Sequence, residues 1–226
     1  MRTYFVTSSG TEIGKTFVTC ELVRQMRGRG DPVRALKPVV SGVTADSFAE
    51  SDTAKLMEAM DIVPDIDLAD AVSRWRFQAA LSPDMAALRE GRSIPFNELV
   101  DHCLHVRAET PGTLMIEGVG GVMVPLGDGR IVLDWMEALK EHIELTPILI
   151  VGSYLGTISH TLTALLALRR HDMPPRTIIV SESEESPVPL EETVEAIRSH
   201  SGGIAVHGLP RLAPGQSAPI MLSWLE

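Results

Sequence analysis

The stretch Thr7-Ser8-Ser9-Gly10-Thr11-Glu12-Ile13-Gly14-Lys15-Thr16 joins a short run of β-forming residues to an amphipathic segment. Residues 4–6 precede the stretch and favour a strand, whereas the apolar residues between Phe17 and Met26 recur at roughly helical spacing. Backbone N–H groups in such a loop, at the positive end of a new helix, are suited to surround a polyphosphate. The stretch therefore predicts a strand, a phosphate-binding loop and a helix.

Three residues of this loop have distinct expected roles. Gly14 lets the backbone approach a phosphate closely, Lys15 supplies a cation to the β- and γ-phosphates, and the Thr16 hydroxyl is suited to ligate Mg²⁺. The usual pattern has a glycine five residues before Gly14, where this chain has Ser9. The alternative interpretation is an ordinary turn in which Thr11 caps the helix.

Length and composition favour one α/β domain spanning residues 1–226, with apolar residues at 44% and a formal net charge of −10. The acidic balance argues against nucleic acid or an anionic membrane as the main partner. Cys20 and Cys103 lie far apart and lack metal-ligand spacing, so we expect two small core residues in a reducing compartment. No leader segment or membrane span is apparent, and we expect a cytoplasmic protein.

Strand-like and helix-like segments alternate along the rest of the chain, a pattern that predicts a mostly parallel sheet flanked by helices in a single P-loop NTPase-like domain. Strands are expected at residues 33–38, 112–116, 146–152, 176–180 and 203–207. Helices are expected from residue 51 or 52, after residues 82–83 and 94–95, and at 156–170 and 190–200. Residues 61–82 have no clear assignment, and 181–189 is expected to be a mobile surface loop.

Charged residues at the ends of the predicted strands are candidates for chemistry. Glu117 ends an all-apolar strand, where a carboxylate is costly unless paired or metal-bound, so we interpret it as a metal ligand. Asp52 fits a helix cap better than a metal ligand on local grounds. Lys37 is suited equally to solvent or to a second cation beside the phosphates. The pair Gly120-Gly121 fits a flexible loop or a simple tight turn.

Several of these stretches together resemble the dethiobiotin synthetase family. The resemblance is carried by Thr11-Glu12-Ile13-Gly14-Lys15-Thr16, Leu36-Lys37-Pro38-Val39-Val40-Ser41-Gly42, Ser51-Asp52, Ile116-Glu117-Gly118-Val119-Gly120-Gly121, Leu155-Gly156-Thr157-Ile158-Ser159-His160 and Gly208-Leu209-Pro210. It implies that 7,8-diaminononanoate takes up CO₂ as a carbamate, that ATP phosphorylates this carbamate, and that the second amine closes a cyclic urea and releases phosphate. The implied cofactor is Mg²⁺, with ATP as co-substrate.

The resemblance also implies a role for each matching residue. Lys15 and Lys37 would be catalytic, and Thr16, Asp52 and Glu117 would hold Mg²⁺. The implied nucleotide-binding residues are Glu12, Ile13, Gly14, Lys15, Thr16, Phe17, Asp52, Glu117, Gly118, Val119, Gly120, Ser181, Glu182, Pro210, Arg211 and Leu212. The implied substrate-binding residues are Ser41, Gly156, Thr157, Ile158 and Ser159. Members of the family bind the substrate carboxylate at a helix start of the other subunit, so the resemblance implies a homodimer with shared sites.

The sequence departs from the family pattern at three places. Ser8 replaces the first glycine of the loop, and Asp84 follows Ser82-Pro83 where the family usually has histidine. Ser181-Glu182 stands where the family commonly has Asn-Asp to bind adenine. Glu182 is able to accept a hydrogen bond from an exocyclic amine, which adenine and cytosine both carry, so ATP is predicted while other nucleotides stay open.

Two other functions share this predicted fold. An amidoligase of the cobyrinic acid diamide type usually carries a glutaminase domain, and no cysteine-centred segment of that kind is present. A nonenzymatic ATP switch of the partitioning or cell-division type carries an extra lysine early in the phosphate loop, where this chain has Ser8-Ser9. A regulatory nucleotide-binding module would need neither Lys37 nor a diamine.

Overall fold

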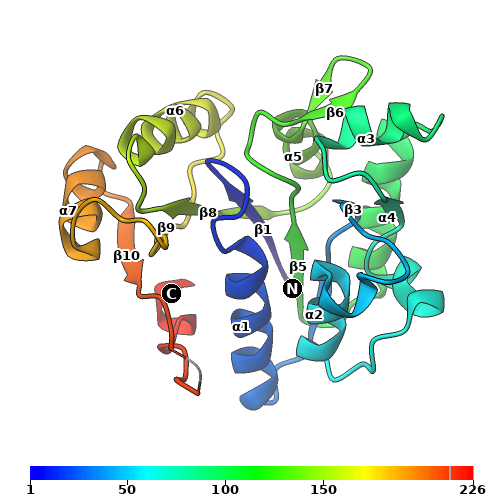
Figure 1. Ribbon diagram of the computed structural model, residues 1–226, viewed down its shortest axis with the longest axis horizontal. Helices are drawn as coiled ribbons and strands as arrows, with labels where there is room; N and C mark the ends of the chain where they lie inside the picture. The colour runs from blue at the N-terminus through cyan, green and yellow to red at the C-terminus, as the bar shows by residue number, and fades with distance from the viewer. Residues whose placement is uncertain (214, 226) are drawn as a thin grey trace.

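The computed structural model describes residues 1–213 and 215–225, which are arranged around a six-stranded sheet (Figure 1). The strand order is β10-β9-β8-β1-β5-β2, and each neighbouring pair in this sheet is parallel. Parallel strands require crossover connections, which the intervening helices provide. The predicted α/β class with a mostly parallel sheet is therefore confirmed.

The bounds of the elements are as follows. The strands are β1 Arg2–Ser8, β2 Val33–Leu36, β3 Val39–Ser41, β4 Trp75–Phe77, β5 Thr113–Glu117, β6 Pro125–Gly127, β7 Arg130–Ile131, β8 Leu145–Gly152, β9 Thr177–Ser181 and β10 Ala205–Leu209. The α-helices are α1 Lys15–Gly28, α2 Asp52–Ala59, α3 Pro83–Arg89, α4 Phe96–Glu109, α5 Val132–Lys140, α6 Thr157–Arg170 and α7 Leu190–His200. The 3₁₀ turns are η1 Phe48–Glu50, η2 Ile66–Ala71 and η3 Leu222–Leu225.

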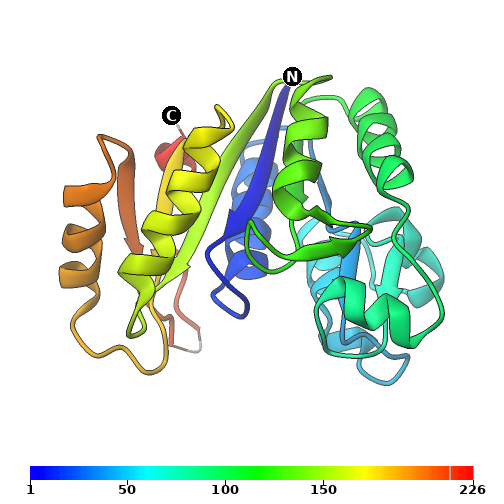
Figure 2. The ribbon, with the colours of Figure 1, turned by 90° about the horizontal axis from the view of Figure 1, so that it is seen from above.

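Helices cover both faces of the sheet, as the view from above makes plain (Figure 2). Alternate residues of each strand point to opposite faces, so Phe5 joins the core formed with α4, α5, α6 and α7, whereas Tyr4 and Val6 join the core formed with α1, α2 and η3. Phe5 makes an edge-to-face contact with the fully buried Trp135 of α5, with ring centroids 4.9 Å apart. No helix in the described ranges is both long enough and apolar enough to span a bilayer.

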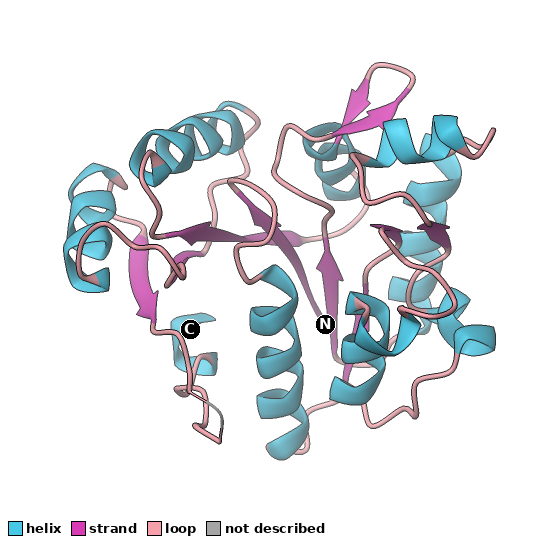
Figure 3. Cartoon of the chain, in the orientation of Figure 1, coloured by secondary structure: helices cyan, strands magenta, loops and turns pink. Residues whose placement is uncertain are grey.

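Most of the predicted elements are present, although several differ (Figure 3). Helix α5 was not predicted, and neither were the short β3–β4 pair and the β6–β7 hairpin. The last strand begins at Ala205 rather than residue 203, because Gly202 and Gly203 both have positive φ and form the turn after α7. Ser181 ends β9 and the 182–189 segment is irregular; Ser153 and Ser183 join the start of this segment to the loop after β8 through reciprocal hydrogen bonds.

The sheet topology brings the candidate residues to one edge. Glu117 at the end of β5 is in register with Val6 of β1, just before the phosphate loop. Lys37 follows β2, which pairs with the other side of β5. Because carboxyl ends of parallel strands meet at one edge of a sheet, three chain segments converge there.

Candidate functional site

The phosphate loop leaves the first helical N–H groups of α1 without a side-chain cap. The N-cap is Gly14, at φ 90°, and not Thr11, so the alternative of a Thr11-capped turn is wrong. A Cβ at Gly14 would lie 2.7 Å from the Ser181 hydroxyl oxygen, so only glycine satisfies both the backbone angle and the close packing. An uncapped helix N-terminus in a loop of this shape is suited to bind an anion.

Lys15 lies almost fully buried beneath the loop. Its ammonium donates to the Ser8 hydroxyl at 3.0 Å and to the carbonyl of Gly10 at 3.2 Å. The Ser8 hydroxyl itself lies 2.6 Å from the Gly10 carbonyl and 2.8 Å from that of Gly120. Burial, followed by repulsion from Lys37, lowers the pKa of Lys15 to about 8. The serine that departs from the family pattern thus links Lys15, the phosphate loop and the Gly120 loop.

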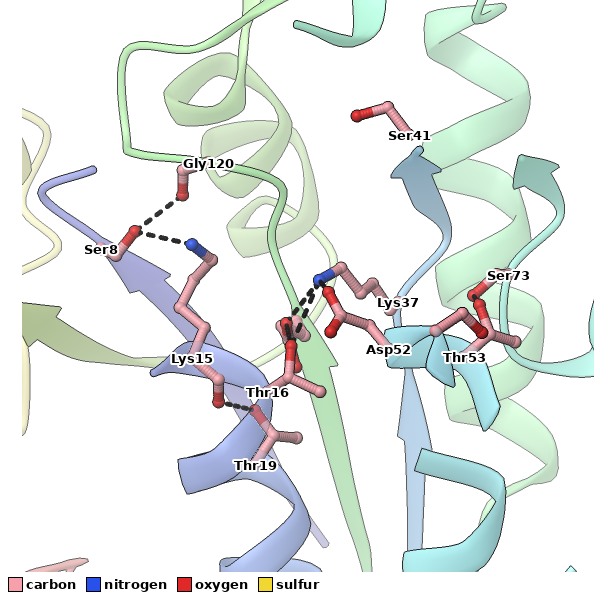
Figure 4. Close-up of polar contacts among 12 residues, drawn as sticks. Ser8, Lys15, Thr16, Thr19, Lys37, Ser41, Asp52, Thr53, Ser73 and Gly120 are labelled. Atoms are coloured by element: carbon pink, nitrogen blue, oxygen red, sulfur yellow. Dashed lines mark hydrogen bonds and ion pairs between the residues drawn. The ribbon is translucent and has the colours of Figure 1, made fainter. Parts of the chain in front are cut away.

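Lys37, Asp52, Glu117 and Thr16 form one polar cluster (Figure 4). The Lys37 ammonium lies 2.8 Å from Oε1 of Glu117 and also pairs with Asp52. The Thr16 hydroxyl donates to the same Glu117 oxygen at 2.7 Å. Burial alone would lower the pKa of Lys37, but the two carboxylates outweigh it and the pKa is raised. Burial likewise opposes ionisation of Asp52, yet Lys37 prevails and lowers its pKa.

The oxygen atoms of this cluster fit a magnesium ion. Oε2 of Glu117 is buried and has no hydrogen-bond partner among the described residues, which is costly for a carboxylate that has no further ligand. Mg²⁺ in proteins takes one or two carboxylates and completes its shell with phosphates and water. Thr16, Asp52 and Glu117 offer such a set, although residues 1–213 and 215–225 contain no group of three His, Cys, Asp or Glu side chains suited to a metal.

Local structure fixes the two carboxylates. Ser51 is the N-cap of α2 and accepts from the N–H of Ala54, so Asp52 is the first helical residue and its side chain is not used as a cap. The next residue, Thr53, is fully buried and donates to the Ser73 hydroxyl at 2.8 Å. The buried Thr53 therefore anchors the start of α2 and holds Asp52 at the rim of the site.

A cavity of about 630 Å³ opens above this cluster. Its lining combines the phosphate loop and α1 start with segments from β3, α2, the 80–83 turn and the Gly120 loop: Thr11, Glu12, Ile13, Gly14, Lys15, Thr16, Phe17, Lys37, Val40, Ser41, Asp52, Ala80, Leu81, Ser82, Pro83, Val119, Gly120 and Val124. Its volume is in the range of sites for drug-sized ligands. The cavity therefore joins a phosphate-binding half to a half that contains Lys37 and Ser41.

A family model and several curated proteins are similar to this chain over most of its length. A family model described as an AAA domain matches residues 2–214. The ATP-dependent dethiobiotin synthetase BioD of Methylobacterium nodulans is 47% identical over 89% of this chain and 90% of its own length. The enzyme of the same name from Acidiphilium cryptum is 44% identical, over 89% of each chain. The chain belongs to the dethiobiotin synthetase family.

Solved structures with a similar fold are more distant from this dethiobiotin synthetase family member. A ParA family ATPase from Chlorobium tepidum TLS has a TM-score of 0.53 at 15% identity, covering 93% of this chain and 84% of that chain. A chain of the MinC:MinD cell division protein complex of Aquifex aeolicus has a TM-score of 0.55 at 11% identity. The match covers 100% of this chain and 85% of that chain. These similarities concern the fold alone.

The residues expected at the nucleobase lie outside the cavity of this family member but beside its phosphate loop. Ser181 packs on Gly14, and the next residue, Glu182, donates its N–H to the Leu209 carbonyl at 2.9 Å. The Glu182 carboxylate accepts from the N–H of Arg211 at 2.8 Å. The segments 181–182 and 210–212 are therefore joined by hydrogen bonds.

The segment 156–159 does not line the cavity of the phosphate loop. It begins α6 and lines a separate, mainly apolar cavity of about 850 Å³ with Leu155, Leu166 and Val188. Gly156 is the N-cap, at φ 95°, without a side-chain cap. Within one chain of this dethiobiotin synthetase family member, the predicted carboxylate-binding residues and Lys37 are thus in different cavities.

Sequence reasoning missed part of the site of this dethiobiotin synthetase family member. Ala80, Leu81, Ser82 and Pro83 line the cavity, whereas the sequence gives no assignment for residues 61–82 and marks Ser82-Pro83 as a helix start before Asp84, where the family usually has histidine. Gly121 is also more than a tight turn, since a Cβ there would lie 3.1 Å from the Ser8 carbonyl oxygen. The Ser-Pro pair after an unassigned stretch and the departure at Asp84 were the available signals.

Proposed function

We propose that this chain forms dethiobiotin from 7,8-diaminononanoate, CO₂ and ATP in an Mg²⁺-dependent ring closure. The observation that carries the proposal is the position of Lys37, which faces Glu117, Asp52 and Thr16 in the cavity that also contains the phosphate loop. A nucleotide-binding module has no need of a second buried lysine at this point. The names and high identity of the family relatives support the same activity.

The phosphate loop would hold the triphosphate of ATP. In this proposal the residues Glu12, Ile13, Gly14, Lys15, Thr16 and Phe17 surround the phosphates, and Gly118, Val119 and Gly120 cover them from the β5 side. Lys15 is already aimed along the loop by Ser8 and Gly10, so it would exchange these partners for phosphate oxygens. Positioning and cationic charge are the main contributions that phosphoryl transfer asks of a protein.

Thr16, Asp52 and Glu117 would hold Mg²⁺, which when bound neutralises charge on the β- and γ-phosphates. The buried, unpartnered oxygen of Glu117 supports this assignment. Lys37 contacts the other oxygen of Glu117, Oε1, and the Asp52 carboxylate, so it would shift toward the substrate as these carboxylates turn to the metal.

The reaction on the diamine would proceed in three steps: carbamate formation, phosphorylation of the carbamate and ring closure. One amine attacks CO₂ and loses a proton to give the carbamate. A carbamate oxygen attacks the γ-phosphorus of ATP, the bond to the β-phosphate oxygen breaks, and ADP leaves. The second amine then attacks the carbonyl carbon of this carbamic-phosphoric anhydride, loses a proton and expels phosphate. Lys37 would stabilise the carbamate and the transferred phosphoryl group, a role suited to a buried cation.

The nucleobase would lie against Ser181 and Glu182, with Pro210, Arg211 and Leu212 beside it. Glu182 is a hydrogen-bond acceptor, and adenine offers an exocyclic amine at its edge. The link from Glu182 to the Arg211 N–H supports a common subsite for the two segments. This is the basis for proposing ATP as the co-substrate.

A homodimer would complete the substrate site. Ser41 would contact the diamine end, whereas Gly156, Thr157, Ile158 and Ser159 of the partner subunit would bind the carboxylate at an uncapped helix start. The separation of the two cavities within one chain, and the exposed Leu155 and Leu166 around the second, support such sharing. We place the reaction in the cytoplasm, in line with two free buried cysteines.

Isotope incorporation tests this proposal. The purified protein is incubated with Mg²⁺, ATP, the diamine and ¹³C-bicarbonate, and the products are separated by mass spectrometry. We expect ¹³C in the ureido carbonyl of dethiobiotin and one ADP for each product molecule. ATP binding without any labelled product would contradict the proposal and favour a regulatory nucleotide-binding module.

A further inference from the structure

Ser82 is the N-cap residue of α3, but its side chain does not cap the helix. A serine at this position usually accepts from a backbone N–H of the first turn, yet here no side-chain cap bond is present. The hydroxyl instead donates to Oδ1 of Asp84, two residues later, at 2.5 Å. The Asp84 carboxylate therefore sets the direction in which the Ser82 hydroxyl donates its proton.

Ser82 lines the cavity, and its donation to Asp84 determines whether its hydroxyl acts there as a hydrogen-bond donor or acceptor. A hydroxyl has one proton and two lone pairs, and a carboxylate acts only as an acceptor. Because the single proton of Ser82 is directed at Asp84, the oxygen faces other groups as an acceptor. A ligand that meets Ser82 in the cavity must supply the N–H or O–H.

The hydroxyl of Ser41, at the end of strand β3, is oriented in the same way. Its hydroxyl donates to the Leu81 carbonyl at 2.7 Å, so it too presents lone pairs. Strand β3 and the 79–82 segment are held together by the hydrogen bond from the Gly42 N–H to the Ala79 carbonyl, at 3.2 Å. Figure 4 shows Ser41 at the tip of β3, above Lys37, and both residues line the cavity. Two acceptor hydroxyls thus share the half of the cavity that contains Lys37.

We propose that Asp84 is a positioning residue that holds the Ser82 hydroxyl as an acceptor for an amino group of the diamine. The assignment rests on the proposed function, since two amines provide the N–H donors that these hydroxyls require. Asp84 acts through Ser82 and need not touch the substrate. The residue that departs from the family pattern is thereby given a role in diamine binding.

The test compares Asp84→Asn, Ser82→Ala and the double variant by the KM for the diamine, the KM for ATP and kcat. An asparagine side chain is isosteric but uncharged, and it can donate its amide N–H to Ser82 as well as accept from it, so the hydroxyl is no longer held as an acceptor alone. We expect each single variant to raise the diamine KM about 10-fold while leaving the ATP KM unchanged. The double variant should match Ser82→Ala, because Asp84 has no effect once the hydroxyl is gone.

Asp65→Asn is the control, since Asp65 is exposed, accepts from the Asp67 N–H in a 3₁₀ turn and does not line the cavity. A diamine KM for Asp84→Asn equal to that of the wild type would overturn the assignment. So would an Asp84→Asn effect that persists in the Ser82→Ala background, or an equal rise in both KM values. A wild-type protein that forms no dethiobiotin would instead contradict the proposed function itself, so the two failures are distinguishable.

Discussion

The ammonium of Lys37 lies 2.8 Å from Oε1 of Glu117, although the residues are 80 positions apart in sequence. Both side chains are buried, and the hydroxyl of Thr16 shares the same carboxylate oxygen. The pair joins the end of β5 to the residue after β2, two neighbouring strands of the sheet. A cation and a metal-ligand candidate thus occupy one point at the edge of the phosphate loop.

Lys37→Ala should abolish ring closure while largely sparing nucleotide binding. The variant loses the cation proposed for the carbamate and the transferred phosphoryl group, whereas Lys15 and the loop backbone stay in place. We expect kcat to fall by about 10³-fold and the dissociation constant for ATP to change less than about 3-fold, measured by product formation and calorimetry. Lys140→Ala, an exposed lysine on α5, is the control. Equal loss of binding and turnover would show that the role of Lys37 is wrong.

Glu117→Gln should raise the Mg²⁺ concentration needed for half-maximal activity. The amide keeps the size of the side chain but removes the charge proposed to face the metal. It also leaves Lys37 with Asp52 as its one carboxylate partner among the contacts of the described residues. The free energy of unfolding without nucleotide should therefore fall by about 3 kcal/mol in urea titrations.

The matched control for that change is Glu109→Gln, an exposed glutamate at the end of α4. It should leave both the Mg²⁺ titration and the unfolding curve unaltered. An Mg²⁺ requirement in Glu117→Gln that matches the wild type would argue against metal binding by this residue.

Glu182 should favour nucleotides that carry an exocyclic amine at the base edge. ATP and CTP carry this amine at the purine 6-position and the pyrimidine 4-position, where GTP and UTP present a carbonyl that a carboxylate repels; the exocyclic amine of guanine is at the 2-position instead. We expect phosphate release with ATP and CTP to exceed that with GTP and UTP by about 10-fold in kcat/KM. Glu182→Gln should reduce this difference in kcat/KM between nucleotides, because the amide can also donate to a base carbonyl. Equal rates with all four nucleotides in the wild type would contradict this reading of the subsite.

Leu166→Glu should weaken a dimer formed through the α6 cavity. Leu166 is 55% exposed, and a charged side chain there would oppose burial against a second subunit. Ultracentrifugation should show dissociation, and the diamine KM should rise while nucleotide binding is kept. Val63→Glu, at a position 82% exposed and outside this cavity, is the control. A monomeric variant with an unchanged diamine KM would argue against shared sites.

Cys20 and Cys103 should not react with thiol reagents in the folded protein. Both are buried; burial raises the pKa of Cys20 to about 12 and that of Cys103 further still. The thiolate is the reactive form, so labelling should await unfolding. Ellman's reagent in buffer and in urea makes the comparison. Rapid labelling of the native protein would contradict the buried position of these thiols.

Sequence periodicity was sufficient for the main sheet because its strands are buried runs with clear ends. Thr113 to Glu117 is such a run, and the loop before Lys15 follows another. Helix α5 was missed even though Val132, Leu133, Trp135 and Met136 recur at helical spacing. It begins directly after the two-residue strand β7, which leaves no loop to mark its start.

The site was less predictable than the fold. Local sequence left Ser51 or Asp52 as the helix cap and favoured a cap over a metal ligand for Asp52, whereas Ser51 is the cap and Asp52 turns to Lys37. The contribution of Ser82 depends on Ala79 packing beside Gly42, a contact between segments about 37 residues apart. Such juxtapositions follow from tertiary packing, which periodicity and spacing do not report.

The most direct test of the account is Mg²⁺-dependent phosphate release with 7,8-diaminononanoate and bicarbonate, measured beside a reaction that omits the diamine. We expect phosphate release that requires the diamine, with one dethiobiotin formed for each phosphate. Phosphate release that is the same without the diamine, or ATP binding with no diamine response, would contradict the proposed reaction.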